Sequence, residues 1–287
     1  WSFFGKTLPA SHWAMLPFLL AVVWLLYRLG LRLGDQRWVW WLLPLVMLDP
    51  VVAGQSALVS PDILLLAWFL LTVEGILGKN KVWIALGTAG LCTVSTRGMI
   101  TAAALAAWSI WELAQTLRIL HPWQVWIKRC LPFLPGFALA GGFLWWHQQA
   151  TGWTGYHADS PWAAAFERSH GAGLLKNTAV IAWRWLDFGR VVEWLVLGWW
   201  MLRQRSQLLA HMGGALGRLL VCLIVFLTPT ALLYANLSAH RYFLPLFVGL
   251  HLFLFQKITS EWVHPATPPR SILNSRFSIL NSQFSLP

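Results

Sequence analysis

Residues 56–71 read SALVSPDILLLAWFLL, and this stretch contains the features that decide the fold of the chain. Beyond Ser60, Pro61 and Asp62 the sequence is apolar without interruption. Serine is a preferred residue just before a helix, and proline is well tolerated in the first turn, so a helix is expected to begin here. A helix needs about 20 mostly apolar residues to cross a membrane. Residues 61–77 are therefore predicted to form a membrane-spanning helix.

The composition of the whole chain favours the same interpretation. Of its 287 residues 57% are hydrophobic and only 11% are charged, whereas about a quarter of a soluble domain is charged. The apolar runs are continuous rather than alternating, which argues against a transmembrane barrel. We therefore predict an all-α, polytopic helical membrane protein with about nine transmembrane helices. The predicted spans are residues 11–28, 38–59, 61–77, 82–98, 99–116, 131–147, 189–202, 217–237 and 241–256.

Basic residues predict which side of the membrane each connection faces. Cytoplasmic connections carry an excess of lysine and arginine. Twelve basic residues fall on every second connection: Arg28, Arg32, Arg37, Lys79, Lys81, Arg118, Lys128, Arg129, Arg203, Arg205, Arg218 and Lys257. These connections are expected to face the cytoplasm of a bacterial cell, with the chain in the inner (plasma) membrane among its lipids. The net charge of +11 then reflects orientation, and no nucleic-acid partner is expected.

The chain divides into two parts. Residues 1–256 are predicted to form the transmembrane domain, with a long outer loop at 148–188. Residues 257–287 are expected to form a disordered cytoplasmic tail, in which SILNSRF (271–277) is followed by SILNSQF (278–284). Two heptads are too few for a stable coiled coil.

The predicted outer face carries few ionisable groups, and these are the candidates for a site. Asp62 lies in the first turn of its helix, where it either complements the helix dipole or serves a function. Arg97 ends one predicted span, with Gly98 at the turn, and Arg241 precedes the last span. Arginines at this level either contact ordinary lipid headgroups or bind a lipid-linked phosphate, which matches their paired donors.

Two further groups of polar residues need an explanation. In the outer loop, His157 and Asp159 are candidates for contact with a hydroxylated substrate or a divalent metal, because long ordered loops are often functional. Asp49 lies inside a predicted span, where its carboxylate either satisfies backbone groups released by Pro50 or faces a functional interior. Four residues of alternating charge, spaced by three, are expected to form a ladder of ion pairs on one helix: Arg184, Asp187, Arg190 and Glu193.

Four stretches together resemble the membrane portion of the GT-C superfamily glycosyltransferases. They are LPFLLAVVWLLYRLGLRL (16–33), LVSPDILLLAWFLL (58–71), STRGMI (95–100) and HRYFLPLF (240–247). The resemblance covers about residues 5–256 and is nearest to glycosyltransferase family 39, which includes protein O-mannosyltransferases and is related to the aminoarabinose transferases. It implies an all-helical enzyme that transfers a sugar from a polyprenyl-phosphate donor to a lipid, glycan or protein acceptor on the extracytoplasmic face.

The resemblance also implies roles for individual residues. Asp62 matches an acidic residue beside the substrate cavity, and Arg241 with Tyr242 matches an Arg-Tyr pair near the carrier phosphate; Arg97 is expected to help hold that phosphate. A divalent metal often assists the leaving phosphate, but no metal-binding residue is assigned in this chain. The general base of the family lies in the first outer loop. None of residues 1–10 is acidic, so the chain is expected to be N-terminally truncated and to lack this base.

Two other classes of function remain open. A transporter or flippase for a lipid or small solute would place polar groups at the membrane midplane, in broken helices, and Asp49-Pro50 fits that description. The third alternative is a non-catalytic membrane partner.

Overall fold

The computed structural model describes residues 8–34, 36–116, 123–154, 159, 163, 167–203, 214–234 and 240–263. Within these ranges the regular structure is helical, apart from one isolated bridge between Arg168 and Tyr234. The chain is thus an all-helical protein, as predicted. The helices are α1 (Leu8–Leu33), α2 (Val39–Met47), α3 (Pro50–Ser56), α4 (Pro61–Leu77), α5 (Lys81–Val94), α6 (Thr96–Thr116), α7 (Trp123–Cys130), η1 (Leu131–Phe133), α8 (Leu134–Thr151), α9 (Ala172–Leu186), α10 (Arg190–Arg203), α12 (Ala215–Leu233), η4 (His240–Phe243) and α13 (Leu244–Val263).

By their length and hydropathy, fewer helices qualify as membrane spans than the sequence predicts. Three helical segments are long and apolar enough to span a membrane: Trp13–Leu33, Ala215–Leu233 and His240–Ser260. A fourth span is possible through α2 and α3, which bend by 74° where they meet. All nine predicted segments are nevertheless mainly helical. The protein is therefore a helical membrane protein with three to four helices that qualify as spans in the described ranges.

Helix α4 forms the centre of the bundle, because most of its side chains are buried. It packs against α1 on one side and α5 on the other. Gly87 of α5 allows the close contact between α4 and α5. A methyl group at Gly87 would lie 3.0 Å from the backbone nitrogen of Thr72 and 3.0 Å from the carbonyl oxygen of Trp68. Small residues let membrane helices approach closely in this way.

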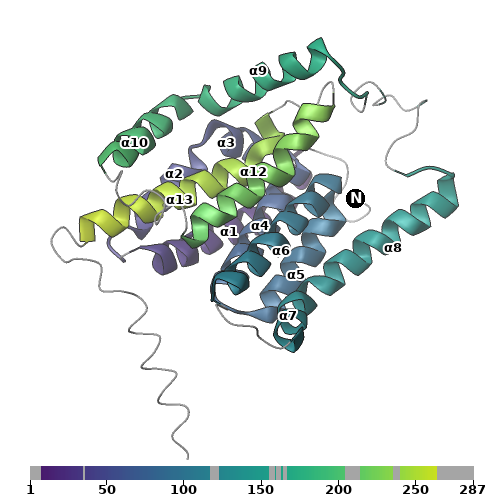
Figure 1. Cartoon of the computed structure of the whole chain (residues 1–287), viewed down its shortest axis with the longest axis horizontal. Coiled ribbons are helices and arrows are strands. Elements are labelled where there is room, and N and C mark those ends of the chain that lie inside the picture. Colours follow the sequence, from purple (N-terminus) through teal and green to yellow (C-terminus); the bar gives the residue numbers. More distant parts are fainter. Residues whose placement is uncertain are drawn as a thin grey trace, which may run out of the picture.

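The other helices surround this centre. Helices α6 and α12 pack together, as do α12 and α13, and α8 packs on α5. Figure 1 shows α9 and α10 along one edge of the bundle, beside α12 and α13, while α8 projects at another edge. Trp145 and Trp146, near the end of α8, are exposed, whereas Gly136 and Ala140, in its first half, are buried.

Two ion-pair groups tie helices together at the ends that the sequence assigns to the cytoplasmic side. The buried carboxylate of Glu74 on α4 accepts hydrogen bonds from Arg28 and Arg32 of α1. Arg218 of α12 binds Glu112 of α6, with 2.6 Å between Nε and Oε1. Some of the predicted cytoplasmic arginines therefore also hold the bundle together.

Three expectations from the sequence are wrong in detail. The break between the fifth and sixth helices lies at Ser95, which is extended, so Arg97 begins α6 instead of ending the preceding span. Gly98 is not the turn; a Cβ there would overlap the carbonyl oxygen of Leu91. The predicted outer loop 148–188 contains the end of α8 and all of α9, which leaves 152–171 as the connection.

The predicted ladder of ion pairs forms only in part and not on one helix: Asp187 pairs with Arg184 and Arg190, whereas Glu193 pairs with His251. Helix α9 ends at Leu186 and α10 begins at Arg190. Between them Phe188 and Gly189 have positive φ values of 52° and 81°, a left-handed conformation that interrupts a right-handed helix. Asp187 therefore lies in a turn, from which it contacts residues on both helices.

Candidate functional site

The structure brings four of the six candidate residues together at one end of the bundle, where α4, α6 and η4 begin. Ser60 caps α4 as predicted, accepting a hydrogen bond from the Asp62 backbone nitrogen at 3.2 Å. Asp62 follows in the first turn and is 1% exposed. One of its carboxylate oxygens accepts a hydrogen bond from the Arg97 guanidinium, and the other lies 3.1 Å from the Ser60 hydroxyl.

Arg97 connects this pair to the segment before α13. Its Nη1 donates to the carbonyl oxygen of Arg241 at 2.6 Å, and its guanidinium lies 4.8 Å from the ring centre of Tyr242. The distance between Asp62 and Arg97 in the sequence is 35 residues, and from Arg97 to Arg241 it is 144. Arg97 is thus the residue that fixes η4 against the beginnings of α4 and α6.

The side chain of Arg241 has a different environment from that of Arg97. It is exposed, and its guanidinium lies 5.4 Å from the centre of the Tyr242 ring. No carboxylate in the described ranges forms an ion pair with it. A permanently charged, exposed guanidinium supported by an aromatic ring can bind an anion with two parallel hydrogen bonds.

These contacts change the expected roles of Asp62 and Arg97. The Asp62 carboxylate is buried and already bonded to the Arg97 guanidinium, so it is not open to solvent. Asp62 is therefore placed to orient Arg97, and Arg97 to hold the backbone of Arg241. Arg97 Nε is buried without a hydrogen-bond partner, so this end of the bundle still has one unsatisfied donor.

The remaining two candidates are His157 and Asp159. His157 lies outside the described residues. Asp159 is described and exposed, and none of the hydrogen bonds that connect the other four residues reaches it. The described residues also contain no group of three His, Cys, Asp or Glu side chains that could hold a metal ion. Asp62, the one acid of the group, is already bound to Arg97, so these residues do not fit a divalent metal.

The structure contains a second polar group in the bundle, in which sequence reasoning missed His251 and the meeting of Asp49 with Arg190. Asp49 pairs with Arg190, with 2.7 Å between Oδ2 and Nη2, and both side chains are 1% exposed. His251 of α13 lies 2.8 Å from Glu193 and 3.9 Å from Asp49. A histidine inside the apolar run LFVGLHLFLF (246–255) was the signal that could have revealed this group.

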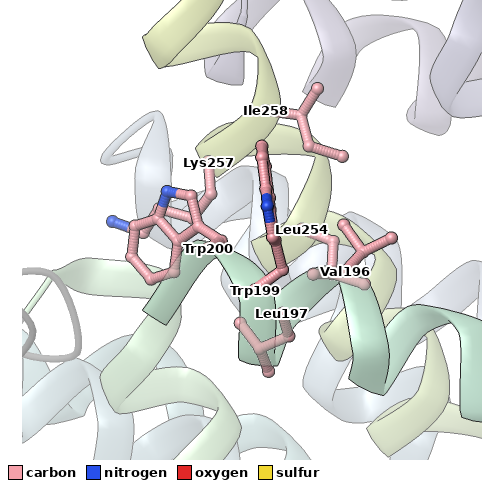
Figure 2. Close-up of a pocket in the computed structure, with 7 residues that line it drawn as sticks. All are labelled: Val196, Leu197, Trp199, Trp200, Leu254, Lys257 and Ile258. Carbon is pink, nitrogen blue, oxygen red and sulfur yellow. The ribbon is translucent and has the colours of Figure 1, made fainter. Parts of the chain in front are cut away.

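Two cavities lie within the described part of the chain, of which one is small and the other is apolar. One, of about 40 Å³, lies between α10 and α13, and Figure 2 shows Trp200 and Lys257 beside each other in its lining. The Lys257 ammonium lies 5.7 Å from the Trp200 ring centre. A sugar does not fit such a space, because ligand pockets usually measure some 300–1,000 Å³. A larger groove, about 340 Å³, is lined by side chains of α6, α7, η1 and α8 that are nearly all apolar.

These observations define a class: an all-helical membrane protein with one polar group at an end of its bundle and another inside it. No protein-family model matches the chain, and neither does any curated protein or solved structure.

Proposed function

We propose that the chain is the membrane portion of a glycosyltransferase. It transfers a sugar from a polyprenyl-phosphate donor to a lipid, glycan or protein acceptor on the outer face of the bacterial inner membrane. The observation that carries this proposal is the exposed Arg241 guanidinium, whose backbone is held by the buried Asp62–Arg97 pair. Its support is chemical: a phosphodiester or phosphomonoester at headgroup level needs a fixed cation, and arginine is the side chain best suited to it.

The residues of this group divide the work between them. Arg241 binds the phosphate of the donor and neutralises the negative charge that develops when the sugar leaves. Tyr242 supports the guanidinium from one side. Asp62 and Arg97 position η4 without touching the donor, because their charged groups are already used in contacts with each other and with the Arg241 carbonyl.

The reaction itself is a displacement at the anomeric carbon. The acceptor hydroxyl forms the new bond to this carbon, the bond to the phosphate oxygen breaks, and the lipid phosphate leaves with the electron pair. A base takes the hydroxyl proton. Asp62 does not fit the role of base because it is buried and paired with Arg97, and the other three residues of the group are not acids.

The proposed orientation places the Arg241 end of the bundle on the outer side. It follows from the twelve basic residues on alternate connections, and the nine crossings predicted from the sequence belong to the same proposal. The ends of α1 and α4 that carry Arg28, Arg32 and Glu74 then face the cytoplasm.

Binding of the carrier lipid tests the proposal. Polyprenyl monophosphate is titrated against the full chain in lipid nanodiscs, and Arg241→Ala is expected to weaken binding at least tenfold, the effect of about one charge-assisted hydrogen bond. Arg241→Lys should lose less, because the charge remains but the paired donors do not. The matched control is Arg203→Ala, which removes another arginine stacked on an aromatic ring, 4.4 Å from the centre of Trp199. Equal affinity of wild type and Arg241→Ala would refute the site.

A second function is favoured by a specific observation. The bend of 74° between α2 and α3 occurs at Asp49, which contacts Arg190 and His251 inside the bundle. Broken helices with charged groups of this kind are typical of transporters. Movement of a fluorescent polyprenyl phosphate between the leaflets of reconstituted vesicles, without release of sugar, would favour a flippase. A non-catalytic partner would neither move the lipid nor bind it through Arg241.

A further inference from the structure

The polar group inside the bundle is centred on the break between α2 and α3. Asp49 occupies the break, where Oδ1 accepts hydrogen bonds from the backbone nitrogens of Val51 and Val52 at 2.8 and 3.2 Å. Its other oxygen, Oδ2, accepts from Arg190, the first residue of α10, at 2.7 Å. Asp49 thus caps one helix and ties a distant one to it. The Arg190 guanidinium also lies over the ring of Phe247 on α13.

His251 lies between two carboxylates in this group. Its Nε2 is 2.8 Å from Oε1 of Glu193 on α10 and 3.9 Å from Oδ2 of Asp49. The side chain of His251 is 1% exposed. Its Nδ1 is buried without a hydrogen-bond partner, and so is Oε2 of Glu193. Because Nε2 faces Glu193, Nδ1 is the ring position left open for a further proton.

The group continues towards the surface through the turn between α9 and α10. Asp187 Oδ1 lies 3.6 Å from Nη1 of Arg190, and its Oδ2 lies 2.5 Å from Nε2 of His240. Arg184 contacts the same carboxylate at 3.2 Å. These three side chains, Arg184, Asp187 and His240, are 10–28% exposed, so the buried residues are connected with a region that water reaches.

The charges of the group do not balance. Among the described residues, three carboxylates (Asp49, Asp187 and Glu193) face two guanidiniums (Arg184 and Arg190), which leaves one negative charge on these residues when both histidines are neutral. An uncompensated charge inside a membrane protein is unfavourable. The ion pairs of His251 come from α10 and the α2–α3 break; α1, α4 and α12 contribute none to it within the described part of the chain. One added proton therefore makes the group neutral.

We propose that His251, between Glu193 and Asp49, is a proton-binding centre of this protein. The proton comes from a hydronium ion of the aqueous phase, adds to the free lone pair of the imidazole and leaves a water molecule behind. His251 becomes an imidazolium whose Nε2 faces both carboxylates, 2.8 Å from Glu193 and 3.9 Å from Asp49, and their negative charge stabilises it. No other bond is formed or broken, and the net charge of the group changes from minus one to zero.

The position of this centre indicates what proton binding can control. Ionisable groups inside membrane proteins commonly mark ion pathways, especially where a helix is broken. Here the contacts of His251, Glu193, Asp49 and Arg190 connect α10 and α13 to the α2–α3 break (Figure 1). Protonation strengthens the contact between α10 and α13, because the hydrogen bond to Glu193 becomes charge-assisted on both sides. The inference does not depend on sugar transfer.

Nitrogen NMR of the full chain in lipid nanodiscs tests the proposal. The nine histidines are labelled with ¹⁵N, and the His251 signal is assigned by its loss in His251→Gln. Between about pH 8 and pH 5, the range in which histidine titrates, the ring nitrogens of His251 should change from the neutral to the imidazolium shift. A His251 signal that stays constant over this range overturns the proposal, whatever the variants do.

A second arm tests the role of the carboxylate. Glu193→Gln removes the excess negative charge, so the proton affinity of His251 should fall at least about tenfold, the effect of losing an adjacent opposite charge. The matched control is Glu112→Gln, which makes the same chemical change at a carboxylate paired with Arg218 on other helices; it should leave the His251 titration unchanged. If size-exclusion chromatography shows that Glu193→Gln is folded and His251 titrates in this variant as it does in the wild type, the proposed centre is contradicted.

Discussion

Neutralising Asp49 is the perturbation for which the structure predicts the largest loss of stability. The side chains of Asp49 and Arg190 are both 1% exposed and pair at 2.7 Å, so Asp49→Asn leaves a guanidinium buried without its carboxylate. Removing one partner of a buried ion pair costs about 3–5 kcal/mol. Asp187 Oδ1, at 3.6 Å from Arg190, compensates part of the charge, and the lower end of this range is expected.

A second substitution at the same position separates two effects. Asparagine still accepts the hydrogen bonds of Val51 and Val52 at the start of α3, whereas alanine does not. Asp49→Ala should therefore cost about 1 kcal/mol more than Asp49→Asn, the usual effect of a lost N-cap. The double variant Asp49→Asn with Arg190→Gln should be less destabilised than the sum of its single variants by about 1–3 kcal/mol.

Equilibrium unfolding in mixed detergent micelles, followed by far-ultraviolet circular dichroism, measures these differences. Glu167→Gln is the control, because the same replacement of a carboxylate by an amide at an exposed acid should alter the free energy of unfolding by less than about 0.5 kcal/mol. The reasoning is refuted if Asp49→Asn unfolds like the control. It is also refuted if the double variant shows the full sum of both losses.

Three further substitutions test the packing of the bundle, each by the same unfolding measurement. Gly87→Ala should destabilise the protein by about 1–3 kcal/mol, because the new methyl group overlaps Thr72 of α4. In the control Gly141→Ala the methyl group meets open space, and this variant should stabilise α8 by up to about 1 kcal/mol. Equal effects of the two variants would contradict the close contact of α4 and α5. Glu74→Gln should cost less than Asp49→Asn, because the two arginines that bind it are 37–40% exposed and can regain water; a larger loss would mean that these arginines cannot be hydrated. Asn177→Ala should cost about 1–3 kcal/mol, because the buried amide donates to the carbonyl oxygens at the end of α12; an unchanged stability would show that α9 is not fixed there.

Local sequence features predicted the helices well. Ser60, Pro61 and the apolar run after them are the signals of a helix start, and α4 begins at Pro61. The break at Ser95 was misplaced by a few residues, since Gly98 was interpreted as a turn. In the structure this glycine is required by the approach of the backbone at Leu91, a contact that has no signature in the local sequence.

The candidate site was predictable only in part. Asp62, Arg97 and Arg241 were selected because charged groups on the outer side of a membrane bundle are few, and Tyr242 because of the family resemblance; the structure brings the four together. The division of roles among them was not predictable. Whether a guanidinium faces solvent or a carboxylate depends on the distance between helix ends, which no residue pattern along the chain reports.

The sequence by itself determined that this protein is helical, apolar and marked by basic residues on alternate connections, because these properties depend on neighbouring residues and on the solvent they prefer. Only the tertiary structure decided which charges meet. Asp49 was expected either to satisfy the backbone beside Pro50 or to face a functional interior; it accepts hydrogen bonds from the backbone of Val51 and Val52 and also binds Arg190, 141 residues further along the chain. Burial makes an unpaired charge costly, so the fold must supply a partner, and that partner is chosen by helix packing.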